Sequence, residues 1–356
     1  MGHTKVLIVD DSLFMRKLIA RLIEEDPQLR VVGAARNGEE AVRMAGELLP
    51  DVITMDVEMP VMNGLEALAR IMKERPVPVV MLSSLTQEGA KETIEALQLG
   101  AVDFIAKPSG STSADLYKIK DEMRQKIKAA AAAPSSALRP IRREPYAAPP
   151  PPRMAVLNRS VPASVRQLIA IGTSTGGPRA LDAVIGELPA GFPYPVLVVQ
   201  HMPPKFTRSL ADRLDSLSKL RVVEAEDGQP LRGGTVYIAP GDFHMTVAEN
   251  GGEYRIQLNR EPQRNGHRPS VDVLFESVAR LSGVKRHYVL MTGMGADGAK
   301  GMLLAKESGA GTTIAEAKES CVVFGMPKAA IELGCVDHVV PLAQIPGKLL
   351  EFTQKS

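Results

Sequence analysis

The stretch IAIGTSTGGP, residues 169–178, decides how the second half of this 356-residue chain is interpreted. Its apolar beginning predicts a buried strand, and the glycines that follow predict a tight turn into a helix. Such a turn either cradles a phosphate or presents a serine nucleophile, here Ser174. A Walker loop requires a lysine after its glycines, and a dinucleotide loop requires a different glycine spacing. Neither pattern is present at Gly172, Gly176 and Gly177, so we favour the serine and keep nucleotide binding as the alternative.

The residues beyond this turn alternate between apolar strands and amphipathic helices, which is typical of a mostly parallel α/β sheet. Strands are predicted at 168–172, 195–200, 235–240, 287–293 and 311–317, and helices near 178–187, 205–218, 271–282 and 298–308. One segment, 244–260, alternates strictly and turns at Asn250-Gly251-Gly252. It predicts a β-hairpin.

A serine nucleophile needs a base and an orienting acid at the same edge of the sheet. His201 directly follows the strand predicted at 195–200, which lies beside the serine strand, so it is the candidate base. A single histidine at a strand end can equally be structural. A second histidine, His267 in the loop NGHRPSVD, could border a site.

The candidate acid is Asp297, in the glycine-rich stretch MTGMGADGA, residues 291–299. A strand is predicted to end at Gly293 and a helix to begin near Asp297, so this aspartate can instead be only a helix N-cap. Asp242 and Asp272 are weaker candidates for the acid. The resulting order along the chain, Ser-His-Asp, differs from the Ser-Asp-His order of lipase-type hydrolases that share the G-x-S-x-G turn.

The first 108 residues show an alternating pattern of their own, with strands predicted at 5–9, 31–35, 51–55, 77–82 and 102–106. In a parallel sheet covered by helices on both faces, ligands bind beyond the carboxyl ends of the strands. Polar residues occupy four of those ends: Asp10-Asp11, Asp56, Ser83 and Lys107-Pro108. Any one of them can be a solvated residue. Three converging carboxylates repel one another, however, and Mg²⁺ relieves that repulsion, so together they predict a metal-binding site.

The composition is that of an ordinary globular protein, with 44% hydrophobic and 24% charged residues and a net charge of +2. Ala, Pro and Ser dominate residues 129–153, which predicts an extended linker. Its basic residues can attract nucleic acid, but no aromatic residues are interleaved with them, so we favour a solvated hinge. Two cysteines, Cys321 and Cys335, argue against a disulfide scaffold. We expect a soluble, cytoplasmic protein, because neither a signal-peptide pattern nor a long apolar run is present.

Residues 4–122 resemble the receiver domain of two-component response regulators, notably in the loop DVEMPVMNG at 56–64. The resemblance implies a flavodoxin-like fold and phosphorylation of Asp56. It further implies that Mg²⁺ is held by Asp10, Asp11, Asp56 and the backbone carbonyl of Glu58. The residues in the places that sense and pair with the phosphoryl group are Ser83, Phe104 and Lys107.

Residues 166–356 resemble the catalytic domain of chemotaxis protein-glutamate methylesterases, the CheB family, in the motifs IGTSTGGP, QHMP, YIAPGDFHM, RPSVDVLFES and LMTGMGADGAKG. The resemblance implies a three-layer α/β esterase domain in which Ser174 is the nucleophile, His201 the base and Asp297 its orienter. The backbone N–H groups of Met294 and Thr175 would serve the oxyanion. Thr173 stands where many members of the family have Ala.

These resemblances predict two doubly wound, mostly parallel α/β domains: a receiver at 1–122, a Pro/Ala-rich linker at 123–165 and a methylesterase domain at 166–356. We expect a phosphorylation-regulated serine esterase that demethylates glutamates of chemoreceptors and can deamidate receptor glutamines. The expected partners are methylated chemoreceptors and a chemotaxis histidine kinase, and the esterase is expected to need no cofactor. We expect a monomer that binds no nucleic acid and does not insert into membranes. The alternative is a receiver joined to a non-catalytic output domain that binds a partner or a nucleotide.

Overall fold

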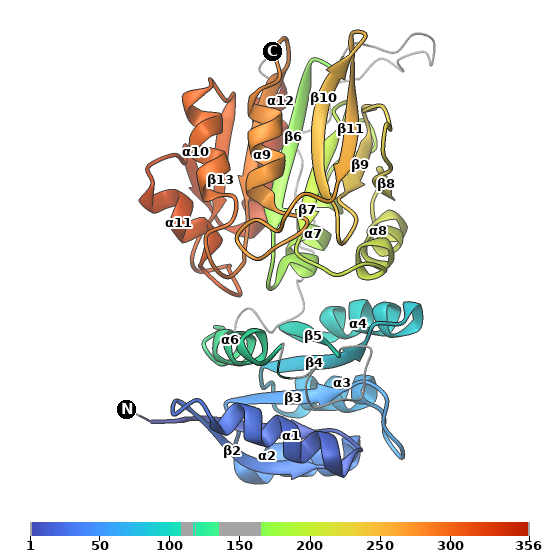
Figure 1. Cartoon of the computed structure of the whole chain (residues 1–356), viewed down its shortest axis with the longest axis vertical. Coiled ribbons are helices and arrows are strands. Elements are labelled where there is room, and N and C mark those ends of the chain that lie inside the picture. The colour runs from blue at the N-terminus through green and yellow to red at the C-terminus, as the bar shows by residue number, and fades with distance from the viewer. Residues whose placement is uncertain (1, 108–116, 118, 135–164, 355–356) are drawn as a thin grey trace. The chain divides into compact units, whose positions relative to one another are not determined.

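The computed structural model describes residues 2–107, 117, 119–134 and 165–354, and the chain divides into two compact units, each with its own parallel sheet (Figure 1). The predicted α/β class is confirmed for both. The predicted linker residues 135–164, and also Pro108, lie outside the described residues. Within the described part of the chain, no helix combines the length and the apolar character that crossing a bilayer requires.

The first unit contains a five-stranded parallel sheet in the order β2-β1-β3-β4-β5, which is the order of flavodoxin-like folds. All five predicted strands are present near their predicted positions: β1 (Thr4–Val9), β2 (Leu29–Ala35), β3 (Val52–Asp56), β4 (Val79–Ser84) and β5 (Asp103–Lys107). The described helices of this unit are α1 (Leu13–Glu24), α2 (Gly38–Leu48), α3 (Gly64–Glu74), α4 (Gln87–Leu99) and α6 (Lys120–Ala131).

Helix α1 shows why these segments fold as their pattern predicts. The Ser12 hydroxyl accepts a hydrogen bond from the N–H of Met15, so the side chain satisfies one of the unpaired donors of the first helical turn. The helix then buries the predicted apolar stripe, made of Leu18, Ile19, Leu22 and Ile23. Burial of this stripe fixes the connection that leaves β1, and this connection carries two of the predicted metal ligands.

The linker begins later than predicted. Helix α6 runs through the boundary that we placed between residues 122 and 123. Met123, Ile127 and Ala130 are fully buried in the core that also contains the stripe of α1. Arg124 donates to the carbonyl oxygen of Leu22 on α1. The alanines after residue 128 suggested a linker by composition, but alanine is also the best helix former, and here it extends a helix that packs.

The second unit contains a seven-stranded parallel sheet in the order β14-β13-β12-β6-β7-β9-β8. The five predicted strands are confirmed as β6 (Gln167–Thr173), β7 (Val196–Gln200), β9 (Thr235–Ile238), β12 (Lys285–Leu290) and β13 (Thr312–Glu316). The predicted helices are α7 (Gly177–Ile185), α8 (Phe206–Leu217), α9 (Val271–Ala279) and α10 (Ala299–Glu307). Five further elements were not predicted: the edge strands β8 (Arg221–Glu224) and β14 (His338–Val340), the helices α11 (Met326–Glu332) and α12 (Ile345–Gln354), and the short 3-10 helix η2 (Leu342–Gln344).

The core of this unit follows the alternation of its strands. Every second residue of the central strands, such as Leu168 and Ala170 of β6 or Tyr288 and Leu290 of β12, packs with Leu274 and other residues of α9. Figure 1 shows α9 lying across the front of this sheet. The chain builds outward from β6 in one direction through β7 and returns to build outward through β12 in the other. Such a switch in direction opens a crevice at the carboxyl ends of β6 and β12.

Two smaller predictions are also confirmed. Strands β10 (His244–Asn250) and β11 (Glu253–Asn259) pair antiparallel, and both turn residues between them, Gly251 and Gly252, have positive φ angles of 61° and 81°. Glycine adopts these angles without steric cost, which explains the Gly-Gly dipeptide at the turn. Cys321 and Cys335 are buried free thiols.

Candidate active sites

The first candidate site lies at the carboxyl edge of the five-stranded sheet. Asp10 follows β1, Asp56 ends β3 and Lys107 ends β5, so the sheet order brings the three side chains together. The Nζ atom of Lys107 lies 2.6 Å from an Asp56 carboxylate oxygen and 3.1 Å from one of Asp10. Carboxylate oxygens of Asp10, Asp11 and Asp56 all lie within 4.8 Å of one another.

The electrostatics of this cluster suit a divalent cation. Burial raises the pKa of the Asp56 carboxyl above its ordinary value; the Lys107 ammonium opposes this shift and the Asp10 carboxylate adds to it. The pKa of Lys107 is also raised: burial alone would lower it, but the two carboxylates outweigh burial. One ammonium therefore shares two buried carboxylates, with the exposed Asp11 beside them, and these oxygen ligands fit Mg²⁺.

The other predicted residues of this site take distinct places. Ser83, near the end of β4, is buried and donates from its hydroxyl to the carbonyl oxygen of Gly89 on α4, at 2.9 Å. Phe104 on β5 is buried, and the ammonium of Lys126 lies 5.1 Å from the centre of its ring. Glu58 is exposed in the loop after β3, two residues beyond Asp56, and its side chain is not part of the carboxylate cluster.

The second candidate site lies at the switch point of the seven-stranded sheet. Ser174 follows β6, His201 follows β7 and Asp297 lies in the connection from β12 to α10. Because β7 and β12 flank β6, the topology brings the three predicted residues to one edge. The His201 Nε2 atom lies 2.8 Å from a carboxylate oxygen of Asp297. The structure thus joins the predicted base to the predicted acid.

Asp297 is an acceptor-only carboxylate surrounded by donors. It is 3% exposed and accepts hydrogen bonds from His201, the backbone N–H groups of Val271 and Asp272, and the side chains of Ser270 and Asn265. Burial by itself would raise the pKa of Asp297, but the bonds from His201, Val271 and Ser270 hold it below its ordinary value. The group is therefore a stable anion, and it does more than cap a helix.

The imidazole of His201 is held on one edge and on one face. Its Nε2 atom is bound to Asp297, whereas its Nδ1 atom is buried with no hydrogen-bond partner among the described residues. The ring of His267 stacks on it, with centroids 3.8 Å apart and planes 9° apart. Because an ionised carboxylate only accepts, the Nε2 atom carries the proton and Nδ1 is the free basic atom.

Gln200 connects the turn that carries the candidate nucleophile to the turn that carries the candidate base. Its side-chain amide donates to the carbonyl oxygens of Ser174 at 3.0 Å and His201 at 3.3 Å. Its Oε1 atom accepts from the Thr173 hydroxyl at 2.6 Å. Gly177 leaves room for this amide, because a Cβ atom at this position would lie 1.8 Å from Gln200 Oε1. Thr173 therefore adds a bond that an alanine at this position would lack.

The two predicted oxyanion residues come from two connections, the turn after β6 and the loop after β12. Thr175 directly follows Ser174 in the turn that enters α7, at the helix N-terminus. Met294 lies in the loop that follows β12 and is half-buried. An N-terminal helix end favours a developing negative charge, which agrees with the placement of Thr175.

Several residues around this site were weaker candidates in the sequence or were not predicted at all. Asp272 is buried beside Asp297 and accepts from the N–H groups of Gly298 and Gly301 at the start of α10. Asp242 instead pairs with Arg268. Asn265 bridges Asp272 and Asp297, and only the Asn-Gly dipeptide at 265–266, a hairpin signal, could have indicated its turn. No sequence pattern indicated the role of Gln200.

Comparisons with known proteins identify the family of each of the two domains. A family model described as CheB methylesterase matches residues 169–349, and one described as a response regulator receiver domain matches residues 6–118. A protein-glutamate methylesterase/protein-glutamine glutaminase of Geobacillus kaustophilus is 54% identical over 352 residues, covering 99% of both chains. One of Thermotoga maritima is 49% identical over 348 residues, covering 98% of both. The crystal structure of the T. maritima CheB methylesterase catalytic domain, 51% identical, covers 52% of this chain and 98% of that one with a TM-score of 0.51.

Proposed function

Because the chain belongs to the CheB methylesterase family, we propose that it hydrolyses the γ-methyl esters of protein glutamates through Ser174, His201 and Asp297. The full-length relatives are named both protein-glutamate methylesterase and protein-glutamine glutaminase. The proposal therefore includes hydrolysis of glutamine side-chain amides by the same residues. The receiver domain makes it a phosphorylation-regulated enzyme. The substrates are the methylated glutamates of chemoreceptors.

The chemistry follows from the atoms that the second site offers. Ser174 Oγ attacks the ester carbonyl carbon while its proton passes to His201 Nδ1. The tetrahedral oxyanion is stabilised by the backbone N–H groups of Thr175 and Met294 and by the N-terminus of α7. The bond to the methoxy oxygen then breaks, and methanol leaves with the proton from His201. Water attacks the acyl-enzyme with the help of the same base, which releases the glutamate and restores Ser174. With a glutamine substrate, ammonia leaves instead.

The observation that carries this function is the 2.8 Å bond between His201 Nε2 and Asp297. The bond pairs one ring nitrogen of His201 with the buried carboxylate of Asp297. The other ring nitrogen stays available as a base, at the edge of the sheet that also carries Ser174. A non-catalytic output domain, the alternative function, has no need of a histidine oriented in this way. The pairing therefore favours an esterase over a binding module.

The first site supports phosphorylation of Asp56. Asp10, Asp11, Asp56 and the backbone carbonyl of Glu58 would hold Mg²⁺, which would supply positive charge to the phosphoryl oxygens. The carboxylate of Asp56 attacks the phosphorus of a phosphohistidine, the phosphorus–nitrogen bond breaks and the imidazole leaves, and Lys107 pairs with the transferred group. The phosphoryl donor is a chemotaxis histidine kinase. The proposal places the protein in the cytoplasm, as a monomer, with this kinase and the chemoreceptors as partners.

The test is methanol release from methylated chemoreceptors by the full-length protein. The Ser174→Ala variant should lose about 10⁴–10⁶ in rate, because removal of one triad member disables the whole unit. Its unfolding temperature should match that of the wild type, because Ser174 is half-buried at a turn. A variant that retained full activity would show that Ser174 is not the nucleophile. An inactive wild type would contradict the esterase itself.

A further inference from the structure

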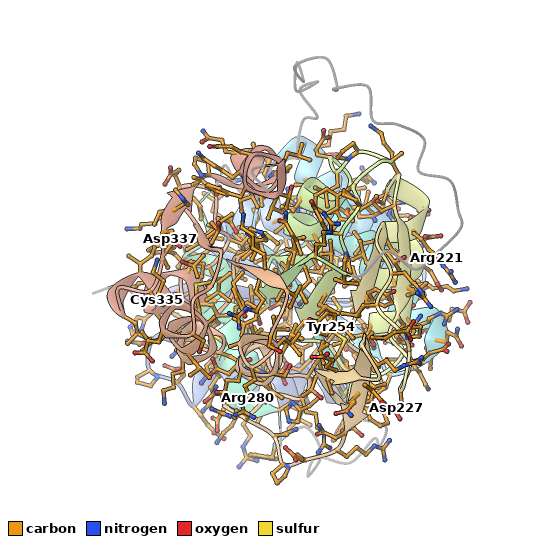
Figure 2. All side chains as sticks on the ribbon, turned by 90° about the horizontal axis from the view of Figure 1, so that it is seen from above. Arg221, Asp227, Tyr254, Arg280, Cys335 and Asp337 are labelled. Carbon is orange, nitrogen blue, oxygen red and sulfur yellow. The ribbon has the colours of Figure 1, made fainter. Side chains whose placement is uncertain are left out.

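The ring of His267 covers one face of the His201 ring. The two imidazoles are nearly parallel, with a 9° angle between their planes and 3.8 Å between their centroids. His267 belongs to the connection between β11 and α9, whereas His201 follows β7, so the fold brings together two residues that are far apart in sequence. Figure 2 draws the described side chains of the chain from above and labels Tyr254 on β11, the strand from which this connection leaves. A parallel stack at this distance is full van der Waals contact over the ring.

His201 needs support of this kind because it has a single polar anchor. The bond from Nε2 to Asp297 fixes one point of the ring, and Nδ1 has no partner among the described residues. A ring fixed at one point can still rock about the axis through that bond, which would displace Nδ1, the atom proposed to take the serine proton. A misplacement of about 1 Å at a reacting atom costs on the order of 10² in rate.

The loop that carries His267 is itself rigidly built. Arg264 and His267 exchange backbone hydrogen bonds of 3.1 Å and 2.9 Å around Asn265 and Gly266, whose φ angles of 53° and 79° are those of a tight two-residue hairpin turn. The Asn265 amide donates to both Asp297 and Asp272 at 3.0 Å. One short turn therefore anchors the acid through Asn265 and covers the base through His267.

We propose that His267 is a positioning residue for the esterase reaction, which holds the His201 ring by stacking so that Nδ1 keeps the position from which it takes the Ser174 proton. The inference rests on the proposed function, since it assigns a role toward the proposed base. In this role His267 acts on His201 through the face of its ring. A phenyl ring should therefore replace it, and a small side chain should not.

The experiment compares three variants of the full-length chain with the wild type: His267→Ala, His267→Phe and, as a matched control, His338→Ala. The control removes a second stacked histidine of the same unit, whose ring lies 4.7 Å from that of Phe352. It lies on the edge strand β14, which is four places from β7 in the sheet. The readouts are kcat and KM for methanol release, the rate at which a fluorophosphonate modifies the serine, and the unfolding temperature.

His267→Ala should lower kcat by about 10- to 100-fold and slow serine modification equally, with KM unchanged, because the base is misaligned in every step that needs it. His267→Phe should return both rates to within a few-fold of the wild type, and His338→Ala should leave them unchanged. The inference is overturned if His267→Ala is as fast as the wild type, or if a folded His267→Phe is as slow as His267→Ala. The variants are compared only after the wild type has been shown to release methanol. A wild type that releases none would contradict the proposed function, whereas the outcomes above concern His267 alone.

Discussion

His201 donates its Nε2 proton to Asp297 across 2.8 Å, and this leaves Nδ1 as the basic atom of the ring. The Asp297 carboxylate determines this tautomer, because it only accepts hydrogen bonds and so requires the proton on the ring nitrogen that faces it. In the Asp297→Asn variant the amide can donate as well as accept, so the ring can adopt the wrong tautomer. We expect kcat to fall by about 10³–10⁴, as loss of a triad carboxylate does in other serine hydrolases.

The same substitution also places an amide N–H among several donors, so a loss of stability of about 1–3 kcal/mol should accompany it. Asp242→Asn is the matched control, because Asp242 pairs with Arg268 and is not bound to His201. Methanol release and thermal unfolding are measured on the same preparations. If folded Asp297→Asn protein kept wild-type kcat, Asp297 would have no part in orienting the base.

Gly177 provides the second prediction, because it makes room for the amide of Gln200. In Gly177→Ala the new methyl group would meet Gln200 Oε1 and the Cβ of Thr173. Gln200 cannot yield without breaking its bonds to Thr173 and to the carbonyl of Ser174. We expect kcat to fall by about 10-fold or more, since the turn that presents the nucleophile must shift.

The control for this prediction is Gly46→Ala. Gly46 lies inside α2 with open space around its missing Cβ, so alanine should raise helix stability by up to about 1 kcal/mol and leave esterase activity unchanged. Kinetics of methanol release and unfolding curves are recorded for both variants. Wild-type kcat in Gly177→Ala would mean that Gln200 does not set the position of Ser174.

The third prediction concerns pH and the buried His287 on β12. Burial lowers the pKa of His287 from 6.5 to about 4, so the folded chain keeps it neutral where the unfolded chain binds a proton. Stability from this group is therefore complete above pH 6.5 and declines as the pH falls to 4, where the loss reaches about 3 kcal/mol. His287→Gln stays neutral and retains a donor for Gln167, so it should lack this part of the pH dependence.

The measurement is the free energy of unfolding in denaturant of the unit that contains His287, for the wild type and His287→Gln between about pH 7 and pH 4. The wild type should lose more stability than the variant across this range. His3→Gln is the control, because His3 is exposed near the N-terminus. Parallel curves for the wild type and His287→Gln would contradict neutral burial of His287.

The strand-end residues illustrate which parts of the sites local sequence determines. Asp10, Asp56 and Lys107 follow apolar runs with clear periodicity, and parallel topology then dictates that they meet at one edge. The same reasoning located Ser174, His201 and Asp297. Because the period of each strand and the order of strands and helices can be recognised in the amino-acid sequence, the residues at the strand ends were predictable from it.

Contacts between loops could not be predicted in this way. Neither the stack of His267 on His201 nor the bridge from Asn265 to Asp297 depends on a periodic pattern; each depends on the path of one connection. Strand β14 is only three residues long, too short to show alternation. The start of the linker was placed too early, inside α6, because alanine-rich sequence fits a linker and a helix equally, and only burial of residues such as Met123 decides between them.

The fourth prediction is that acetyl phosphate with Mg²⁺ phosphorylates a single residue, Asp56. This carboxylate shares Lys107 with Asp10, and phosphorylation would replace its charge with a group that Lys107 can still pair with. Intact-mass analysis of the wild type should show one added phosphoryl group. The Asp56→Asn variant should show none, and Asp51→Asn, an exposed aspartate just before β3, should label like the wild type. Equal labelling of Asp56→Asn would place the phosphoacceptor elsewhere.

The fifth prediction is that phosphorylation of Asp56 raises esterase activity, and that Ser83 transmits the change. The Ser83 hydroxyl is bound to the carbonyl of Gly89 at 2.9 Å and must leave it to bind a phosphoryl group, which would alter the first turn of α4. A coupling of about 1–3 kcal/mol corresponds to roughly 5- to 150-fold activation. We therefore expect methanol release by the wild type to rise by a factor in this range with acetyl phosphate and Mg²⁺, and that by Asp56→Asn to stay at its basal value. Ser83→Ala should be phosphorylated, by intact mass, yet be activated much less. Full activation of Ser83→Ala would show that Ser83 does not transmit the change. Equal rates of methanol release by phosphorylated and unmodified wild type would exclude activation by the receiver.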